Sequence, residues 1–187
     1  MPRLLTDTDV AGFRERLIVA AEHLFAERGA DGVTMRQLAA ELGVSPMTPY
    51  RYFKDKDAIL AAVRASGFDR FATAMEEAVG DLKDPIKQSE ATGRAYVRFA
   101  LGHPDAYRLM FDFAQPGEAD YPELVEASAR SRRMLVRHAE GLVAAGLAKG
   151  EPVMIAHILW AALHGGLGLQ MAGKLSPDVD PSALRRE

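Results

Sequence analysis

The chain has 187 residues, of which 48% are hydrophobic and 26% are charged, a composition typical of a globular protein. Its formal net charge of −3 argues against a generally basic nucleic-acid-binding surface, and the absence of cysteine excludes disulfides and thiol chemistry. No wholly apolar run reaches the roughly eighteen residues of a membrane-spanning helix, and Met1–Val10 has no apolar segment of signal-peptide length. We therefore expect a cytoplasmic protein with no membrane partner.

The first predicted helix runs from about Asp9 to Arg28 and ends at Gly29. One of its faces is apolar at helical spacing and consists of Leu17, Ala21, Leu24 and Phe25. We expect this face to close a three-helix core together with Leu38, Leu42 and Phe53.

Residues 34–56, TMRQLAAELGVSPMTPYRYFKDK, are predicted to form two short helices joined by a tight turn. Thr34 and Gln37 have the spacing of a capping box, which starts the first helix. Gly43 ends it, because only glycine takes a left-handed conformation without a steric penalty. Ser45 can then cap a second helix with Pro46 at its first position. This spacing is that of a DNA-reading helix-turn-helix.

The second helix of this pair has two faces. Positions 49, 50 and 53 fall on one side, where Phe53 must be buried. The opposite side, with Met47, Thr48 and Arg51, suits a major groove, whereas tyrosine and lysine side chains beside it suit phosphates. The predicted DNA-contacting residues are Thr34, Arg36, Ser45, Pro46, Met47, Thr48, Tyr50, Arg51, Tyr52 and Lys56. The alternative interpretation is a helical hairpin whose polar residues are merely solvated.

Pro49 leaves the register of this helix open. If Ser45 is the cap, position 49 would be the first amide to donate inside the helix, and proline cannot donate. Proline also disfavours helical angles at Thr48. Either the first turn is distorted, or Thr48 is the cap and the reading helix is barely longer than one turn.

Residues 14–60 closely resemble the N-terminal domain of the tetracycline-repressor (TetR) family of one-component transcriptional regulators. The resemblance runs in order through Ala20-Ala21-Glu22-His23-Leu24-Phe25-Ala26-Glu27-Arg28-Gly29, Val33-Thr34-Met35-Arg36-Gln37-Leu38-Ala39, Gly43-Val44-Ser45 and Tyr50-Arg51-Tyr52-Phe53-Lys54-Asp55-Lys56-Asp57-Ala58-Ile59-Leu60. The family commonly has a small residue at position 47 and an aliphatic residue at position 49, whereas this chain has Met47 and Pro49.

The chain continues with helical patterns only. Asp55 is predicted to cap a helix that starts at Lys56 and reaches Gly80, with Gly67 as a point where it could bend. Further helices are expected over about 85–101 and 105–113, and Gln115-Pro116-Gly117 breaks the second of these. We place a domain boundary near Ser66, which gives a helix-turn-helix domain over residues 1–65 and a second domain over residues 66–187.

Two long helices, 121–146 and 151–172, are predicted to close the fold. The last is apolar on nearly all sides, so it needs cover both from its own domain and from a second subunit. We expect Leu163 and Leu167 to lie in the dimer contact. Beyond Gly173 the polar, proline-containing tail is predicted to fray.

The C-terminal half resembles the TetR subgroup with a Trp-His-Gly signature, through Trp160-Ala161-Ala162-Leu163-His164-Gly165, Tyr96-Val97-Arg98-Phe99-Ala100 and His103-Pro104-Asp105-Ala106-Tyr107-Arg108-Leu109-Met110-Phe111. The resemblance implies an all-α fold with a C-terminal helical bundle that binds an effector and forms a homodimer through its last two long helices. It also implies a repressor that binds double-stranded operator DNA, an inverted repeat, and releases it when a small molecule is bound.

The aromatic and methionine residues of this half exceed what a tight bundle needs, so we predict an effector pocket among them. Its predicted lining is Phe71, Met75, Tyr96, Phe99, Phe111, Met134, His138, Trp160 and His164. The histidines are expected to be buried and hydrogen-bonded rather than metal-bound, and no catalytic constellation or cofactor site stands out. The alternatives are a helical ligand-binding protein without specific DNA binding and, more distantly, a helical-bundle enzyme.

Overall fold

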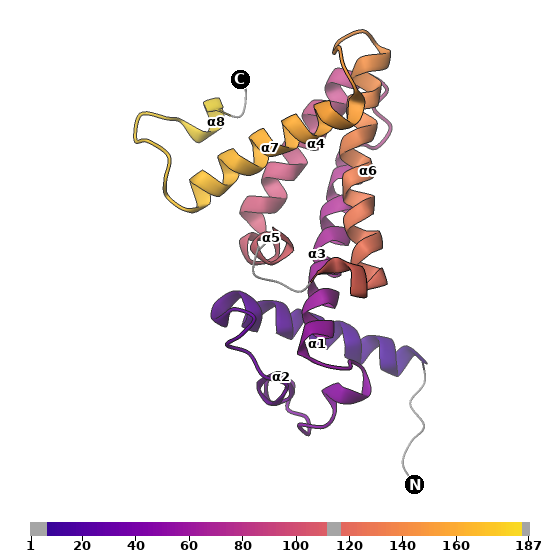
Figure 1. Cartoon of the computed structure of the whole chain (residues 1–187), viewed down its shortest axis with the longest axis vertical. Helices are drawn as coiled ribbons and strands as arrows, with labels where there is room; N and C mark the ends of the chain where they lie inside the picture. Colours follow the sequence, from indigo (N-terminus) through magenta and orange to yellow (C-terminus); the bar gives the residue numbers. More distant parts are fainter. Residues whose placement is uncertain (1–6, 112–116, 185–187) are drawn as a thin grey trace. The chain divides into compact units, whose positions relative to one another are not determined.

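The computed structural model describes residues 7–111 and 117–184, and the side chains from residue 11 onward (Figure 1). Within these ranges the chain forms eight α-helices and two 3-10 helices, and no strand. Their bounds are α1 Asp7–Arg28, α2 Met35–Glu41, η1 Pro49–Arg51, α3 Lys56–Val79, α4 Pro85–Gly102, α5 Pro104–Phe111, η2 Glu118–Asp120, α6 Pro122–Ala144, α7 Pro152–Met171 and α8 Pro181–Leu184. The predicted all-α fold is confirmed. Gln115 and Pro116, which were predicted to break a helix, lie outside the described residues.

The helices group into two compact units. The first comprises Met1–Arg70 with His103–Ala129, and the second comprises Phe71–Gly102 with Arg130–Glu187. Both α3 and α6 therefore begin in the first unit and end in the second. This grouping assigns α5 to the first unit, whereas the partition near Ser66 assigns it to the second domain; that partition stays a prediction.

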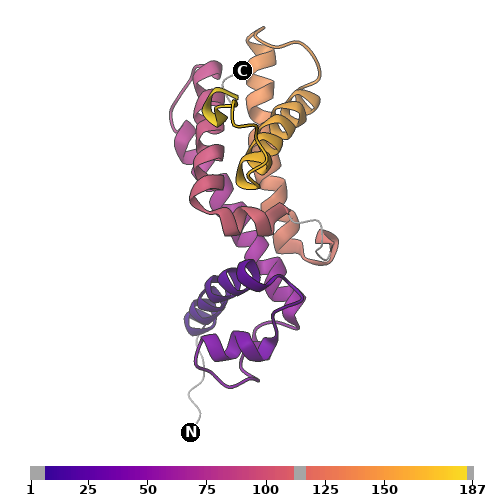
Figure 2. The same cartoon turned by 90° about the vertical axis from the view of Figure 1, so that its left-hand side faces the viewer.

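The first unit is built on the predicted three-helix core. Leu17, Ala21, Leu24 and Phe25 of α1 are buried, as expected. They meet Leu38 of α2 and Phe53, with Leu42 packed against the cluster from its edge. Figure 2 shows α1, α2 and the start of α3 arranged around this common centre. Leu109 of α5 joins the same cluster, a contact that the sequence did not predict.

The helix α3 continues through Gly67 without a break. The glycine serves a close approach instead: a Cβ atom built on it would lie 2.9 Å from Cγ and 3.1 Å from Sδ of Met110. Met110 is itself buried, with 1% of its surface exposed. Gly67 therefore lets α5 pack directly against the backbone of α3 within the first unit.

The second unit has an aromatic core. Phe71 packs edge-on against Tyr96 and Phe99 of α4, with ring centroids 4.9 and 5.2 Å apart. Trp160 of α7 donates its indole N–H to the Tyr96 hydroxyl at 3.0 Å. Arg130 of α6 pairs with Glu76 near the end of α3 and also donates to the Thr73 hydroxyl at 3.1 Å. These contacts tie α4, α6 and α7 to the C-terminal part of α3.

The helix α7 is apolar on nearly all sides but only partly covered. It packs on α4 and α8, and of its residues only Ala156 and Leu167 are buried. By length and composition it is the one described helix that could cross a membrane, which is weak evidence for doing so. The tail beyond Gly173, predicted to fray, instead forms α8, whose start is capped by the Asp180 carboxylate at 2.9 and 3.1 Å.

Candidate nucleic-acid interface

The first helix of the predicted helix-turn-helix begins as its sequence requires. The Thr34 hydroxyl accepts from the Gln37 amide at 3.3 Å, while the Gln37 side-chain oxygen accepts from the Thr34 amide at 2.8 Å. This reciprocal capping box is confirmed and satisfies two otherwise unpaired amides. Gly43 takes φ +64°, the left-handed conformation predicted for the end of this helix. Together these features fix both ends of α2.

The second helix of the predicted pair, residues 45–53, is called the reading element below. It is a series of tight turns rather than a regular α-helix. The Ser45 carbonyl accepts from the Thr48 amide at 2.8 Å, and the Thr48 carbonyl accepts from the Arg51 amide at 3.1 Å. The Pro49 carbonyl then accepts from the amides of Tyr52 and Phe53, both at 3.0 Å. The helix is short, as one of the two outcomes left open by Pro49 requires, because only Pro49–Arg51 is helical. Thr48 precedes this helix but makes no side-chain capping hydrogen bond, so its predicted role as the cap is not confirmed.

One expectation about this segment is wrong. Thr48 has φ −64° and ψ −46°, which are helical angles, although proline follows it. The turn closed by the Ser45 carbonyl holds Thr48 in this conformation, and Pro49 is buried beneath it. Pro49 therefore removes one N–H donor from this segment but does not turn the backbone at Thr48 away from helical angles.

The two faces of the reading element are now defined by exposure. Phe53 is buried, and the Arg14 guanidinium lies 4.7 Å from the centre of its ring. Met47 is 67% exposed and Arg51 is exposed, as predicted for the outer face. Tyr50, which helical periodicity placed on the side of Phe53, is instead 49% exposed.

The remaining predicted DNA-contacting residues differ in how free their side chains are. Thr34, Arg36, Ser45 and Pro46 are exposed, and Thr48 is half-buried. The Tyr52 ring stacks on Phe13 at 4.4 Å, which leaves its hydroxyl end as the part that can reach DNA. The Lys56 ammonium donates to the Ala30 carbonyl at 2.6 Å. Lys56 thus has a structural partner that spacing along the sequence could not indicate.

Asp55 caps α3 as predicted, because its carboxylate accepts from the Ala58 amide at 2.8 Å. The cap places Lys56 at the first position of a helix that runs to Val79. The positive charges of Arg51, Lys54 and Lys56 lie within this short stretch of an otherwise acidic chain. They give this part of the chain a local positive charge, which attracts the negatively charged phosphate backbone of DNA.

The predicted effector residues are found mostly in the core of the second unit. Phe71, Met75, Tyr96, Phe99, Met134 and His138 are all buried, and Trp160 and His164 are half-buried. Phe111 belongs to the first unit, where it packs edge-on against Phe68 and Tyr107. The use of these residues to bind an effector stays a prediction.

A polar pair lies inside this aromatic core. The Thr92 hydroxyl and Nε2 of His138 are 2.6 Å apart, and Nδ1 of His138 is buried with no hydrogen-bond partner among the described residues. Burial lowers the pKa of His138, the Arg137 charge lowers it further, and burial also lowers the pKa of His164. Both shifts favour the neutral form of the imidazole. No group of three or more metal-ligating side chains is found in the part of the chain that the structure describes.

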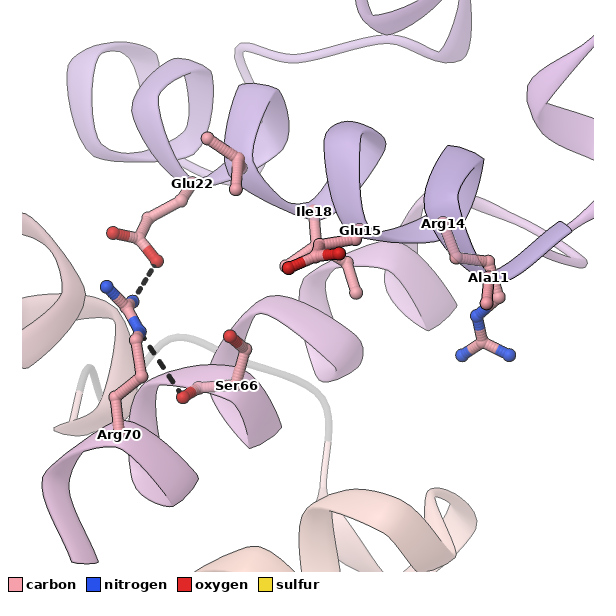
Figure 3. A pocket seen from close by; sticks show the side chains of 8 residues that line it. Ala11, Arg14, Glu15, Ile18, Glu22, Ser66 and Arg70 are labelled. Atoms are coloured by element: carbon pink, nitrogen blue, oxygen red, sulfur yellow. Dashed lines mark hydrogen bonds and ion pairs between the residues drawn. The ribbon is translucent and has the colours of Figure 1, made fainter. Parts of the chain in front are cut away.

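A surface hollow of about 540 Å³ lies within the first unit, and none of the predicted effector residues lines it (Figure 3). It is lined by Ala11, Arg14, Glu15, Ile18, Val19, Glu22, Ser66 and Arg70. Figure 3 shows the Arg70 guanidinium reaching from α3 to the Glu22 carboxylate on α1. This ion pair crosses one end of the hollow and holds α3 to α1.

A partly buried charge pair between α3 and η2 was not predicted from the sequence. Arg64 is 8% exposed and its guanidinium lies 3.2 Å from the Glu118 carboxylate. The Ser128 hydroxyl donates to the other Glu118 oxygen at 2.9 Å. Glu118 is 54 residues from Arg64 in the chain, so no local pattern could have paired them. The contact binds η2 and α6 to α3 within the first unit.

Comparison with known proteins gives two family matches. Residues 17–63 match the bacterial regulatory proteins of the tetR family, and residues 89–186 match the tetracyclin repressor-like C-terminal domain. The chain is 28% identical over 134 residues to the HTH-type transcriptional regulator HbdR of Aromatoleum sp. (strain CIB). The matched region covers 71% of this chain and 58% of HbdR. The chain spans about half the length of the next curated relatives, with 49% and 45% covered. The Trp-His-Gly subgroup stays a prediction.

Solved structures agree with the all-α fold. A protein of unknown function from Rhodococcus sp. RHA1 has a TM-score of 0.79 and 34% identity, over 92% of this chain and 89% of that chain. The TetR family transcriptional regulator PfmR from Thermus thermophilus has a TM-score of 0.70 and 18% identity, over 91% of this chain and 93% of that chain. The second likeness concerns the fold alone.

Proposed function

The chain belongs to the TetR family, and from this premise we propose that it is a DNA-binding transcriptional regulator, a homodimeric repressor that a small molecule releases from its operator. The family assignment argues against the alternative interpretation, a helical ligand-binding protein without specific DNA binding. We expect the regulator to act in the cytoplasm, without a cofactor and without catalysing a reaction.

The observation that carries the DNA-binding proposal is the outer face of the reading element. Arg51 is exposed there, on a segment whose opposite side is anchored by buried Pro49 and Phe53. A guanidinium held in this way can bind guanine through two hydrogen bonds, which discriminates by about 1–3 kcal/mol against other bases. Arg36 and Lys54 supply phosphate contacts that carry no sequence information.

The dimer proposal rests on the open side of α7. From Pro152 to Gly173 the sequence has no charged residue. Met154 and Ile158 are each 61% exposed and Leu169 is 48% exposed, and their spacing places them on one face. Gly165 and Gly168 on the same side have no atom within 4 Å of a Cβ built on them.

A second copy of the chain is the proposed occupant of this face. TetR-family regulators act as dimers, and an isologous contact between two such faces would remove the apolar surface from water. The opposite side of α7 already packs on α4 and α8, as expected for a helix in a bundle rather than one surrounded by lipid. We propose that α6 completes the interface beside α7. A two-fold dimer presents two reading elements and so requires an inverted-repeat operator.

The effector proposal rests on the aromatic core of the second unit. Apolar and aromatic side chains with a few converging polar groups are the usual lining of small-molecule sites. Phe71 and Met75 lie on α3, and the same unbroken helix begins at Lys56 beside the reading element. An effector that shifts these side chains would therefore act on the helix that carries the reading element. The change in operator affinity equals the effector's differential affinity for the two states, typically about 1–3 kcal/mol.

The experiment starts with selection of duplexes from a random library by the full chain, followed by fluorescence anisotropy on the enriched sequence. We expect an inverted repeat, bound more tightly than a scrambled duplex. Small apolar and aromatic compounds are then tested for release of the protein from that duplex. Tyr96→Phe, which removes the hydroxyl that accepts from Trp160, should change the compound concentration required without changing operator affinity in its absence. Failure to enrich any sequence would contradict the proposal.

A further inference from the structure

The outer face of the reading element is more apolar than a DNA-binding surface needs to be. Pro46 is exposed, Met47 is 67% exposed and Tyr50 is 49% exposed, and all three lie within five consecutive positions. Single exposed apolar residues are common on protein surfaces. Here, however, they lie on the one segment that the helix-turn-helix presents to DNA, beside the exposed cation Arg51.

The backbone that carries Met47 is unusually stiff. Pro46 and Pro49 fix φ on both sides of the Met47-Thr48 pair. The Ser45 carbonyl accepts from the Thr48 amide at 2.8 Å, and buried Pro49 anchors the segment to the core. The Met47 side chain therefore projects from a preformed turn, so little backbone entropy is lost when this turn is docked.

The same segment has few backbone donors to offer to DNA. Neither Pro46 nor Pro49 has an N–H group. The Thr48 amide is used by the Ser45 carbonyl, and the Met47 amide points to the Ser45 hydroxyl at 3.4 Å. Hydrogen bonds to DNA from this turn must therefore come mainly from side chains, and Met47, at 67% exposure, is the large apolar side chain that it presents.

We infer that Met47 reads a thymine methyl group in each half-site, an inference that rests on the proposed operator-binding function. The C5-methyl of thymine is the apolar group that the major groove displays, and a flexible, polarisable thioether can adapt to it. Arg51 follows Met47 by four residues, and at the rise of about 2.0 Å per residue of 3-10 winding this is a separation of about 8 Å. Base pairs rise by about 3.4 Å. The thymine that Met47 reads thus lies within about two base pairs of the guanine that Arg51 reads.

The test uses the selected duplex with single thymines replaced by uracil, which removes the methyl group and leaves every hydrogen-bonding group in place. Burial of one methyl-sized group corresponds to about a fourfold change in affinity. We expect one thymine per half-site, next to or one step beyond a guanine, at which the replacement weakens binding about fourfold, and about fifteenfold when both half-sites are replaced.

Two matched variants assign that effect to Met47. Met47→Leu keeps an apolar side chain and should keep the sensitivity to uracil. Met47→Gln has a similar length but is polar, so thymine and uracil should bind equally well and adenine should become the preferred base. Both substitutions are at an exposed position and should leave the melting temperature unchanged.

The outcomes separate this inference from the function on which it rests. If the parent chain shows no sequence-specific binding, both the operator-binding function and the role of Met47 are overturned. Specific binding by the parent chain with no uracil-sensitive thymine would overturn the role of Met47 alone. Uracil sensitivity that survives in Met47→Gln would assign the methyl contact to another residue and would also overturn it. Loss of the sensitivity in Met47→Gln together with its retention in Met47→Leu supports the inference.

Discussion

Ile158→Ala should weaken the dimer while leaving the protomer folded. Ile158 lies in the middle of the open face of α7 and is 61% exposed in the single chain. Full burial of an isoleucine side chain contributes about 1.5–3 kcal/mol, so burial of the exposed part contributes about 1–2 kcal/mol. The two-fold axis doubles this to about 2–4 kcal/mol per dimer. The dissociation constant of the dimer should therefore rise about 30-fold to several hundred-fold.

Position 158 is a better test than the positions that periodicity suggested. Leu167 is 0% exposed, so it belongs to the core of the second unit and not to an interface. Its truncation would lower the free energy of unfolding by about 2–5 kcal/mol and obscure any effect on association. The sequence pattern could not distinguish the two faces of α7, because both are apolar.

The assay is sedimentation velocity over a concentration series, with the melting temperature of each variant measured alongside. Val19→Ala on α1 is the matched control, because Val19 is 67% exposed and the proposed interface does not include α1. The proposed interface is refuted if Ile158→Ala associates as tightly as the parent chain. It is also refuted if Val19→Ala weakens association by a comparable factor, since the effect would then not belong to α7.

Three further predictions concern the reading element, the close approach at Gly67 and the buried histidine. Lys56→Ala should weaken binding to all duplexes and reduce the salt dependence of binding by about one unit, measured by anisotropy at several salt concentrations; it should also lower the melting temperature, because the Ala30 carbonyl loses its donor. Gly67→Ala should lower the free energy of unfolding by about 1–3 kcal/mol through the clash with Met110, whereas Gly93→Ala, with no atom within 4 Å, should raise it by up to about 1 kcal/mol. Burial lowers the pKa of His138 in the folded protein below the value of 6.5 expected in the unfolded chain, so on acidification the unfolded chain takes up this proton at a higher pH. The free energy of unfolding should therefore be highest above pH 6.5 and decrease as the pH falls below it. His138→Asn should flatten that fall in urea titrations at several pH values, and an unchanged slope would show that His138 is not its source.

Local chemistry determined what could be predicted. The capping box at Thr34, the left-handed Gly43 and the Asp55 cap each depend on residues within a few positions, and all three are confirmed. The effect of Pro49 could not be predicted because Ser45 and Thr48 were both possible caps of the helix that contains it. In the structure the helix is short, Pro49–Arg51, and Thr48 precedes it with helical angles and without a side-chain capping hydrogen bond.

Long-range contacts could not be predicted in the same way. The Arg64–Glu118 pair joins residues 54 positions apart, and the Lys56 ammonium reaches back 26 positions to the Ala30 carbonyl. A glycine within a helix is equally ambiguous in sequence, since it can permit a bend or a close approach. At Gly67 only the position of Met110 shows that the close approach is the reason.

The most direct measurement is the ratio of affinities for the selected operator and for a scrambled duplex of the same composition, in the parent chain and in Arg51→Ala. Arg98→Ala, which removes an exposed arginine from α4 in the second unit, is the control for loss of charge alone. We predict that Arg51→Ala reduces the ratio by about 5- to 150-fold per half-site while Arg98→Ala leaves it unchanged. An unchanged ratio in Arg51→Ala would contradict the claim that this surface reads DNA.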